Sequence, residues 1–203
     1  MVYAGHVGSA DAKPLVSELI LGWEEWVSLP GLGLPAIKAK IDTGARTSAL
    51  HASLIEPFGA AEKPMVRFVV HPRPGRDDLA VVCAAPVVDR REVTSSNGES
   101  EVRYVIVTDI SVGGVTWPIE VSLTDRSTMS YRMLIGRKAI RSDMFVDAAT
   151  SFRQPRLSFK LYGHASTAQS PPRPLRFAVL TLQPDASTVQ RLAEAATSRG
   201  HAV

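Results

Sequence analysis

The sequence is short of several features that define whole classes of protein. It contains one cysteine, Cys83, in 203 residues, which excludes an internal disulfide and any zinc or iron–sulfur site that needs several cysteine ligands. This cysteine lies in an apolar run at residues 79–88. We therefore predict that it is a small buried side chain that serves packing.

Long hydrophobic runs and blocks of like charge are also missing. No stretch of about 18 uncharged apolar residues occurs, and residues 1–13 lack a basic segment followed by an apolar one. The 23 Lys and Arg and the 20 Asp and Glu give a net charge of +3, but neither sign gathers into a dense patch. We therefore expect a cytoplasmic protein with neither a membrane nor a nucleic acid as its partner.

One nucleotide-binding motif and one zinc-binding motif are absent as well. The chain has no Gly-rich loop ending in Lys-Ser or Lys-Thr, so it is not expected to bind ATP by itself. It has no His-Glu-x-x-His either, and its five histidines are scattered. His51 is the candidate ligand if zinc binds, and a structural histidine is the alternative.

What the sequence does have is a succession of short strands with an apolar residue at every second position. We predict strands at residues 19–29, 37–42, 65–71, 79–88, 87–94, 101–110, 116–124, 133–135 and 156–161, and a short helix at 138–146. Asn97-Gly98 marks the tip of a long hairpin because both residues tolerate positive φ. Many short strands with almost no helical periodicity predict a mainly β protein, a closed or nearly closed β-barrel with one short helix.

The composition divides the chain into four parts. Residues 1–16 are expected to be a disordered lead-in, 17–162 the barrel, 163–174 a Pro-rich linker, and 175–203 a partial α/β unit of one strand and one helix. A strand and a crossover helix need a returning parallel strand to form a sheet. We therefore expect the chain to be a fragment of a longer polypeptide.

The candidate site is the corner Asp42-Thr43-Gly44-Ala45. The alternating strand at 37–42 delivers Asp42 on its polar face to a tight turn. A turn aspartate that satisfies its own backbone is the ordinary alternative. Far downstream, the run Leu134-Ile135-Gly136-Arg137 ends another apolar strand.

The corner, the long hairpin and the apolar-apolar-Gly-Arg run together resemble the retropepsin-like aspartic protease fold. The chain is more similar still to one bacterial family, the retropepsin-like ATP-dependent zinc proteases associated with RimK-type ligases. The resemblance covers about residues 18–162 and is carried by Gly22-Trp23-Glu24-Glu25-Trp26, residues 40–51, Thr124-Asp125-Arg126, Met129 and residues 133–138. Residues 175–203 resemble the opening strand and helix of RimK-type ATP-grasp ligases, which add glutamate to protein C-termini.

This resemblance implies a homodimeric aspartic peptidase. Such chemistry needs two carboxylates that share one proton, and the chain has one Asp-(Ser/Thr)-Gly. Asp42 from each of two chains would therefore meet on a two-fold axis. Thr43 would hydrogen-bond across that axis, and Gly44 would let a backbone approach.

The same resemblance implies that three further residues support the structure of the site. Arg137 would tie the strand beneath the corner to the corner by a charge-assisted hydrogen bond. Gly136 and Ala45 would shape the backbone on either side of that contact.

Arg46, Arg103 and Arg126 are expected to form a cationic pocket for an acidic, glutamate-rich peptide tail; surface salt bridges are the alternative. No cofactor is expected for the aspartic mechanism. Two other functions stay open: a zinc-dependent protease, and a non-catalytic module that presents acidic tails to a fused RimK-type ATP-grasp ligase.

Overall fold

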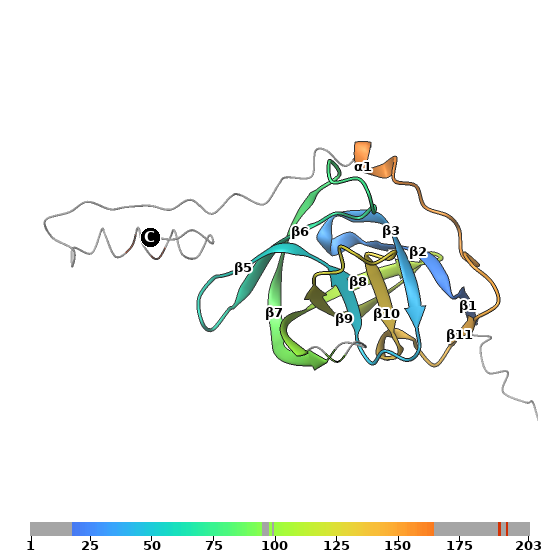
Figure 1. The fold of residues 1–203 in the computed structure, drawn as a ribbon, viewed down its shortest axis with the longest axis horizontal. Coiled ribbons are helices and arrows are strands. Elements are labelled where there is room, and N and C mark those ends of the chain that lie inside the picture. The colour runs from blue at the N-terminus through green and yellow to red at the C-terminus, as the bar shows by residue number, and fades with distance from the viewer. Residues whose placement is uncertain (1–17, 95–97, 99, 165–190, 192–193, 195–203) are drawn as a thin grey trace, which may run out of the picture.

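The computed structural model describes residues 18–94, 98, 100–164, 191 and 194 (Figure 1). In that part of the chain the strands are β1 (Leu19–Gly22), β2 (Glu24–Leu29), β3 (Leu34–Asp42), β4 (Ser48–His51), β5 (Ser53–Phe58), β6 (Met65–Val70), β7 (Val81–Thr94), β8 (Ser100–Val112), β9 (Val115–Thr124), β10 (Met133–Gly136) and β11 (Met144–Asp147). Two 3₁₀ turns, η1 (Pro30–Leu32) and η2 (Arg137–Ala139), and one helix, α1 (Leu161–His164), complete the described elements.

Six strands close into a barrel in the order β2-β3-β10-β4-β9-β8, because β2 returns to pair with β8 through Ser28 and Ser111. Beyond β8 the sheet continues through β7 and β6 to β5, which Figure 1 shows reaching away from the barrel. β1 and β11 form a separate parallel pair. The predicted mainly β fold, a closed barrel with one short helix, is confirmed.

Alternation along the strands separates the core from the site. In β3, Ile37, Ala39 and Ile41 are buried, whereas Lys40 is exposed and Asp42 is half-buried. Burying such aliphatic side chains contributes about 1.5–3 kcal/mol each. Cys83 is buried as predicted, and burial raises the pKa of its thiol to about 12.

The structure divides one predicted strand into two and joins two others into one. Residues 19–29 form two strands that meet at Trp23, whose N–H bonds to the Thr150 carbonyl at 2.9 Å. The two strands predicted at 79–88 and 87–94 are one long strand, β7, which begins at Val81 and has a register shift between Val87 and Asp89. The irregularity lets one strand bend where two were expected.

The predicted helix at 138–146 is wrong. The chain makes only the turn η2 and then β11, which pairs in parallel with β1 from Leu19↔Met144 to Gly22↔Asp147. The partner strand lies more than a hundred residues earlier in the chain, and its backbone supplies hydrogen bonds that a helix would make locally.

The predicted strand at 156–161 is also wrong. Residues 153–158 have no regular structure, and α1 follows. Tyr162 of α1 donates a hydrogen bond to the Ala36 carbonyl at 2.6 Å, and its ring packs near Phe159. Aromatic packing against the barrel therefore determines the path of this segment.

The predicted lead-in, the tip of the hairpin apart from Gly98, and the linker beyond His164 lie outside the described residues, as does the α/β unit except at two positions. Those predictions stay predictions. Gly98 has φ +86°, a conformation that favours glycine. Of the helices in the described ranges, none has the length and apolar character needed to cross a membrane.

Candidate active site

The corner that carries Asp42 is held between two strands by a third. β3 ends at Asp42 and β4 begins at Ser48, yet these consecutive strands are not neighbours. β10 lies between them, parallel to β3 with Gly136 opposite Asp42, and antiparallel to β4 (Figure 1). A strand from far along the chain thus fixes both arms of the corner.

The Asp42 carboxylate is only partly committed within the chain. Its Oδ1 accepts the N–H of Ala45 at 3.1 Å, and its Oδ2 lies 3.9 Å from Lys40 Nζ. The Asp42 side chain is 29% exposed and that of Lys40 is 48% exposed, so their attraction is weak. The carboxylate is therefore held by the turn and remains open to solvent or to a partner.

Arg137 supports the corner from beneath. Its Nη1 donates to the Gly44 carbonyl at 2.7 Å, and its backbone N–H donates to the Ala45 carbonyl at 2.9 Å. A Cβ on Gly136 would lie 2.5 Å from the Thr47 carbonyl carbon, so this close approach of two backbones requires glycine. The structure thus brings Ala45, Gly136 and Arg137 together at the corner.

A cavity of about 1070 Å³ lies beside the corner. Its wall is built from the corner itself, from the β7 and β8 hairpin strands, and from residues 124–129. Asp42, Gly44 and Ala45 line it, together with Arg103 and Arg126. The carboxylate therefore faces a space large enough for a peptide side chain or more.

Arg103 and Arg126 converge on this cavity, and Arg46 does not. Arg103 donates from Nε to Glu101 Oε1 at 2.5 Å. Burial and the nearby Arg103 lower the pKa of Arg126, whereas Asp42 raises it. Arg46 and Thr43 are exposed at the turn and are not in the cavity wall. Their roles in substrate binding and in the dimer stay predictions.

Sequence reasoning missed Glu101, the polar neighbour of Arg103. Glu101 Oε1 also accepts the Thr124 hydroxyl at 2.5 Å, so one carboxylate joins β8 to β9 inside the cavity. Period-two alternation placed Lys40 on the same face as Asp42, and it could have placed Glu101 with Arg103 in the same way, since each pair lies two residues apart on one strand. The pairing with Thr124 depends on β8–β9 register, which the sequence did not give.

His51 does not present a zinc site. Its Nδ1 accepts the N–H of Arg126 at 2.9 Å, and its ring is buried. Asp125 Oδ1 lies 3.5 Å from the same Nδ1, but an ion pair there would need a proton on the nitrogen that accepts. Burial and Arg132 lower the pKa of His51, so we assign the neutral ring. Among the described residues no three His, Cys, Asp or Glu side chains gather as metal ligands, so the donors present do not fit zinc.

The Trp-Glu-Glu-Trp run holds the segment that follows residues 124–129 of the cavity wall. Glu24 Oε2 accepts the Tyr131 hydroxyl at 2.5 Å, and the Trp23 ring meets the Tyr131 ring edge-on at 5.9 Å. Burial, together with Glu24, raises the pKa of Tyr131 to about 12, so the hydroxyl remains a donor. The segment that follows Arg126 is thereby tied to β2.

Comparison with known proteins identifies a family for this chain. Residues 20–157 match the family described as RimB-like, "Retropepsin-like aspartic endopeptidase RimB". A protein of Shewanella pealeana named "Probable alpha-L-glutamate ligase" is 43% identical over 189 residues, which cover 91% of this chain and 41% of the relative. A Parasynechococcus marenigrum protein of the same name is 41% identical over 192 residues, covering 92% of this chain and 40% of the relative. The chain thus spans about two fifths of the length of these relatives.

A solved structure agrees. The crystal structure of a Legionella pneumophila protein of unknown function (DUF785) superposes with a TM-score of 0.55 at 29% identity, covering 66% of this chain and 97% of that one. Since the family match runs through most of the described barrel and includes the Asp42 corner, the chain belongs to the RimB-like family of retropepsin-like aspartic endopeptidases.

Proposed function

We propose that this chain is one half of a homodimeric aspartic peptidase that cleaves acidic, glutamate-rich peptide tails in connection with a RimK-type ligase. The observation that carries the proposal is a partly exposed Asp42 at a rigidly supported corner, beside a cavity into which Arg103 and Arg126 converge. The family membership supports the reaction class.

The dimer follows from the number of carboxylates. Aspartic peptidases need two close carboxyl groups, because two like charges at that distance share one proton. The chain has one Asp-Thr-Gly corner, and among the described residues the charged side chain that pairs with its carboxylate is a cation, Lys40, at 3.9 Å. A second copy would place the second Asp42 opposite the first across a two-fold axis.

In that arrangement each Asp42 has a different task during one turnover. The ionised carboxylate takes a proton from water as the water oxygen bonds to the peptide carbonyl carbon, and the protonated carboxyl gives its proton to the carbonyl oxygen. Collapse of the resulting diol breaks the C–N bond. One diol hydroxyl returns its proton to the carboxylate left ionised by the first step, and the departing nitrogen takes the proton that the other carboxyl group gained from water. The Arg137 bond to Gly44 would hold each turn in position during these steps.

The substrate class rests on the cavity and on the relatives. Arg103 and Arg126 can pair with carboxylates, and guanidinium groups suit bidentate carboxylate contacts. The longer relatives are named glutamate ligases, which makes glutamate the amino acid to test first. A peptidase attached to such a ligase would trim the tails that the ligase extends.

The test uses the full chain with two peptides of equal length, one ending in oligoglutamate and one in oligoglutamine. We expect cleavage of the glutamate tail, loss of cleavage in Asp42→Asn with unchanged thermal unfolding, and normal cleavage in Asp109→Asn, which changes an exposed aspartate on β8. Sedimentation should find a dimer. A strictly monomeric protein that cleaves, or equal cleavage by Asp42→Asn, would refute the proposal.

A second candidate is a non-catalytic module that holds acidic tails for a ligase, favoured by the ligase names of the relatives. It predicts tight binding of the oligoglutamate peptide with no product at any pH. The same peptides distinguish the two functions, because binding without turnover by the wild-type dimer supports the module and turnover excludes it.

A further inference from the structure

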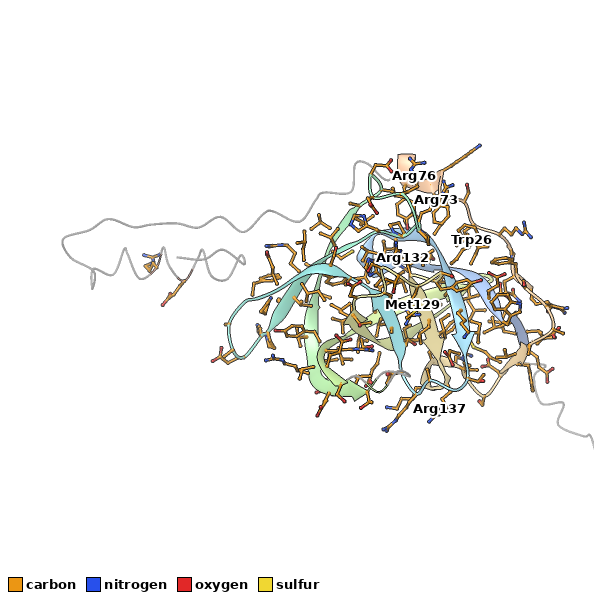
Figure 2. The ribbon with its side chains drawn as sticks, viewed as in Figure 1. Trp26, Arg73, Arg76, Met129, Arg132 and Arg137 are labelled. Carbon is orange, nitrogen blue, oxygen red and sulfur yellow. The ribbon has the colours of Figure 1, made fainter. Side chains whose placement is uncertain are left out.

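A second cavity lies apart from the Asp42 corner. It holds about 500 Å³ and is built from β2, β3 and residues 72–74, 130–132 and 157–159, and it shares no lining residue with the Asp42 cavity. Figure 2 places Arg73, Trp26 and Arg132, which line it, away from Arg137 at the other end of the barrel. Its chemistry is therefore separate from that of the corner.

Three cationic side chains line this cavity: Lys38, Arg73 and Arg132. Within the described ranges none of the three makes an ion pair with a carboxylate. In that part of the chain, each positive charge is therefore left without a counter-charge in direct contact.

Aromatic rings position two of these cations. Lys38 Nζ lies 5.3 Å from the Trp26 ring centroid, and Arg73 Cζ lies 5.5 Å from the Phe159 ring centroid. Such cation–π contacts fix a cation without neutralising it, so its N–H groups stay available for an anion. Trp26 and Phe159 also line the cavity and offer an apolar wall.

Arg132 is the most unusual of the three because it is buried, at 6% exposure. Its Nη1 donates to the Arg126 carbonyl at 3.0 Å, but its Nε has no hydrogen-bond partner in the described part of the chain. A buried cation is costly unless an opposite charge or a full set of acceptors compensates it. The hydrogen bonds and charge of Arg132 are thus not fully compensated within the described part of the chain.

Among the described residues, Glu24 is the one acidic residue in the cavity wall, and its single negative charge faces three cations. Its Oε2 accepts the Tyr131 hydroxyl at 2.5 Å. The wall therefore keeps an excess of positive charge that an external anion can meet.

We propose that this second cavity binds a compact anionic oxygen group, a carboxylate or a phosphate, between Lys38, Arg73 and Arg132. The aromatic wall would receive the apolar part of the same ligand. This inference does not depend on the Asp42 chemistry, because the site shares no residue with the corner cavity.

The experiment titrates the full chain with inorganic phosphate and, separately, with triglutamate. Binding is followed by the heat released and by tryptophan fluorescence, to which Trp26 in the cavity wall contributes. We expect saturable binding of at least one probe below about 10 mM. Binding of phosphate alone shows that the site takes a phosphate, and binding of triglutamate alone shows that it takes a carboxylate. Lys38→Ala and Arg73→Ala should each weaken that binding about tenfold, the loss of one charge-assisted contact.

Arg76→Ala is the matched control. Arg76 lies in the same loop region (Figure 2), but its guanidinium is bonded to Asp78 through Nε and Nη2 and does not line the cavity. Binding should be unchanged in this variant. No saturable binding of either probe, equal weakening in Arg76→Ala, or triglutamate binding that is lost in Arg103→Ala and kept in Arg73→Ala, would overturn the proposal. Thermal unfolding verifies that each variant is folded, and Arg73 is exposed, so Arg73→Ala decides if Lys38→Ala does not fold.

Discussion

Arg137 Nη1 and the Gly44 carbonyl oxygen are joined by a 2.7 Å hydrogen bond between residues 93 positions apart. The bond connects the end of β10 to the turn that follows Asp42. Two backbone bonds run beside it, from Arg137 N to Ala45 O and from Lys138 N to Arg46 O. The turn is thus held by one side chain and two backbone N–H groups from the residues that follow β10.

Replacing Arg137 by alanine should harm activity more than stability. The side chain is exposed at this bond, so we expect a loss of about 1 kcal/mol in the free energy of unfolding, as for one hydrogen bond. Cleavage should fall by about tenfold or more, because misplacing Asp42 affects the reacting geometry directly. Urea unfolding and kcat/KM measure the two effects.

Arg141→Ala is the control for Arg137, since it removes an exposed arginine nearby whose partner is Asp143. It should leave kcat/KM unchanged. Arg137→Lys should recover part of the activity, because lysine keeps one charged donor without the planar fork. Equal losses in Arg137→Ala and Arg141→Ala would contradict a positioning role.

The barrel was predictable because its signals are local, whereas the contact between Arg137 and the corner was expected from the family resemblance. Alternation in residues 37–42 placed Asp42 on the polar face, and the Gly136-Arg137 run identified the strand beneath the corner. What could not be predicted depends on distant backbone. The sequence at 138–146 fits a helix, but β1 supplies the parallel partner that makes residues 144–147 a strand.

The polar interior of the cavity was hidden for a similar reason. Glu101 and Thr124 meet only because β8 and β9 pair in one register. Arg46, in contrast, follows Asp42 closely in sequence, yet the turn directs it out of the cavity wall. Nearness in sequence was a poor guide to nearness in the site.

Glu25 should be one of the most sensitive positions for stability. This fully buried carboxylate accepts the backbone N–H of Gly22 at 2.7 Å, of Arg153 at 2.9 Å and of Gln154 at 3.3 Å. Glu25→Gln brings an amide donor against one of these donors, and we expect a loss of about 2–3 kcal/mol. Chemical unfolding measures it.

Glu62→Gln makes the same chemical change at an exposed turn and should lose less than about 0.5 kcal/mol. If both variants unfold at the same denaturant concentration, Glu25 does not hold residues 153–154 against β1 as the structure indicates.

His51 should make stability depend on pH below neutrality. Burial, reinforced by Arg132, lowers its pKa below the usual 6.5. The unfolded chain then binds a proton that the folded chain refuses, so the stability is fully present above about pH 6.5 and is lost as the pH falls toward the folded pKa. The slope reaches at most about 1.4 kcal/mol per pH unit.

His51→Asn tests this, because an asparagine oxygen can accept the Arg126 N–H without titrating. Unfolding measured from pH 7 to pH 5 should show a shallower loss of stability in the variant than in the wild type. Carboxylates with lowered pKa values whose neighbours do not include His51, such as that of Asp147, titrate lower and act alike in both proteins. Parallel curves would assign the pH dependence to other groups.

Glu101 should limit how strongly the cavity attracts acidic peptide. Its carboxylate already pairs with Arg103, whose side chain is 13% exposed, and accepts the Thr124 hydroxyl. An incoming glutamate has to compete with this resident carboxylate for the same guanidinium. In an Asp42→Asn background, Glu101→Gln should therefore bind the oligoglutamate peptide about three- to tenfold more tightly, while the oligoglutamine peptide is unaffected. Glu120→Gln is the control, because it removes a comparable carboxylate that pairs with Arg91 outside the cavity wall. In the same Asp42→Asn background, this variant should bind the oligoglutamate peptide as tightly as Asp42→Asn alone. Weaker binding in Glu101→Gln would mean that Glu101 orients Arg103 for the substrate instead of competing with it.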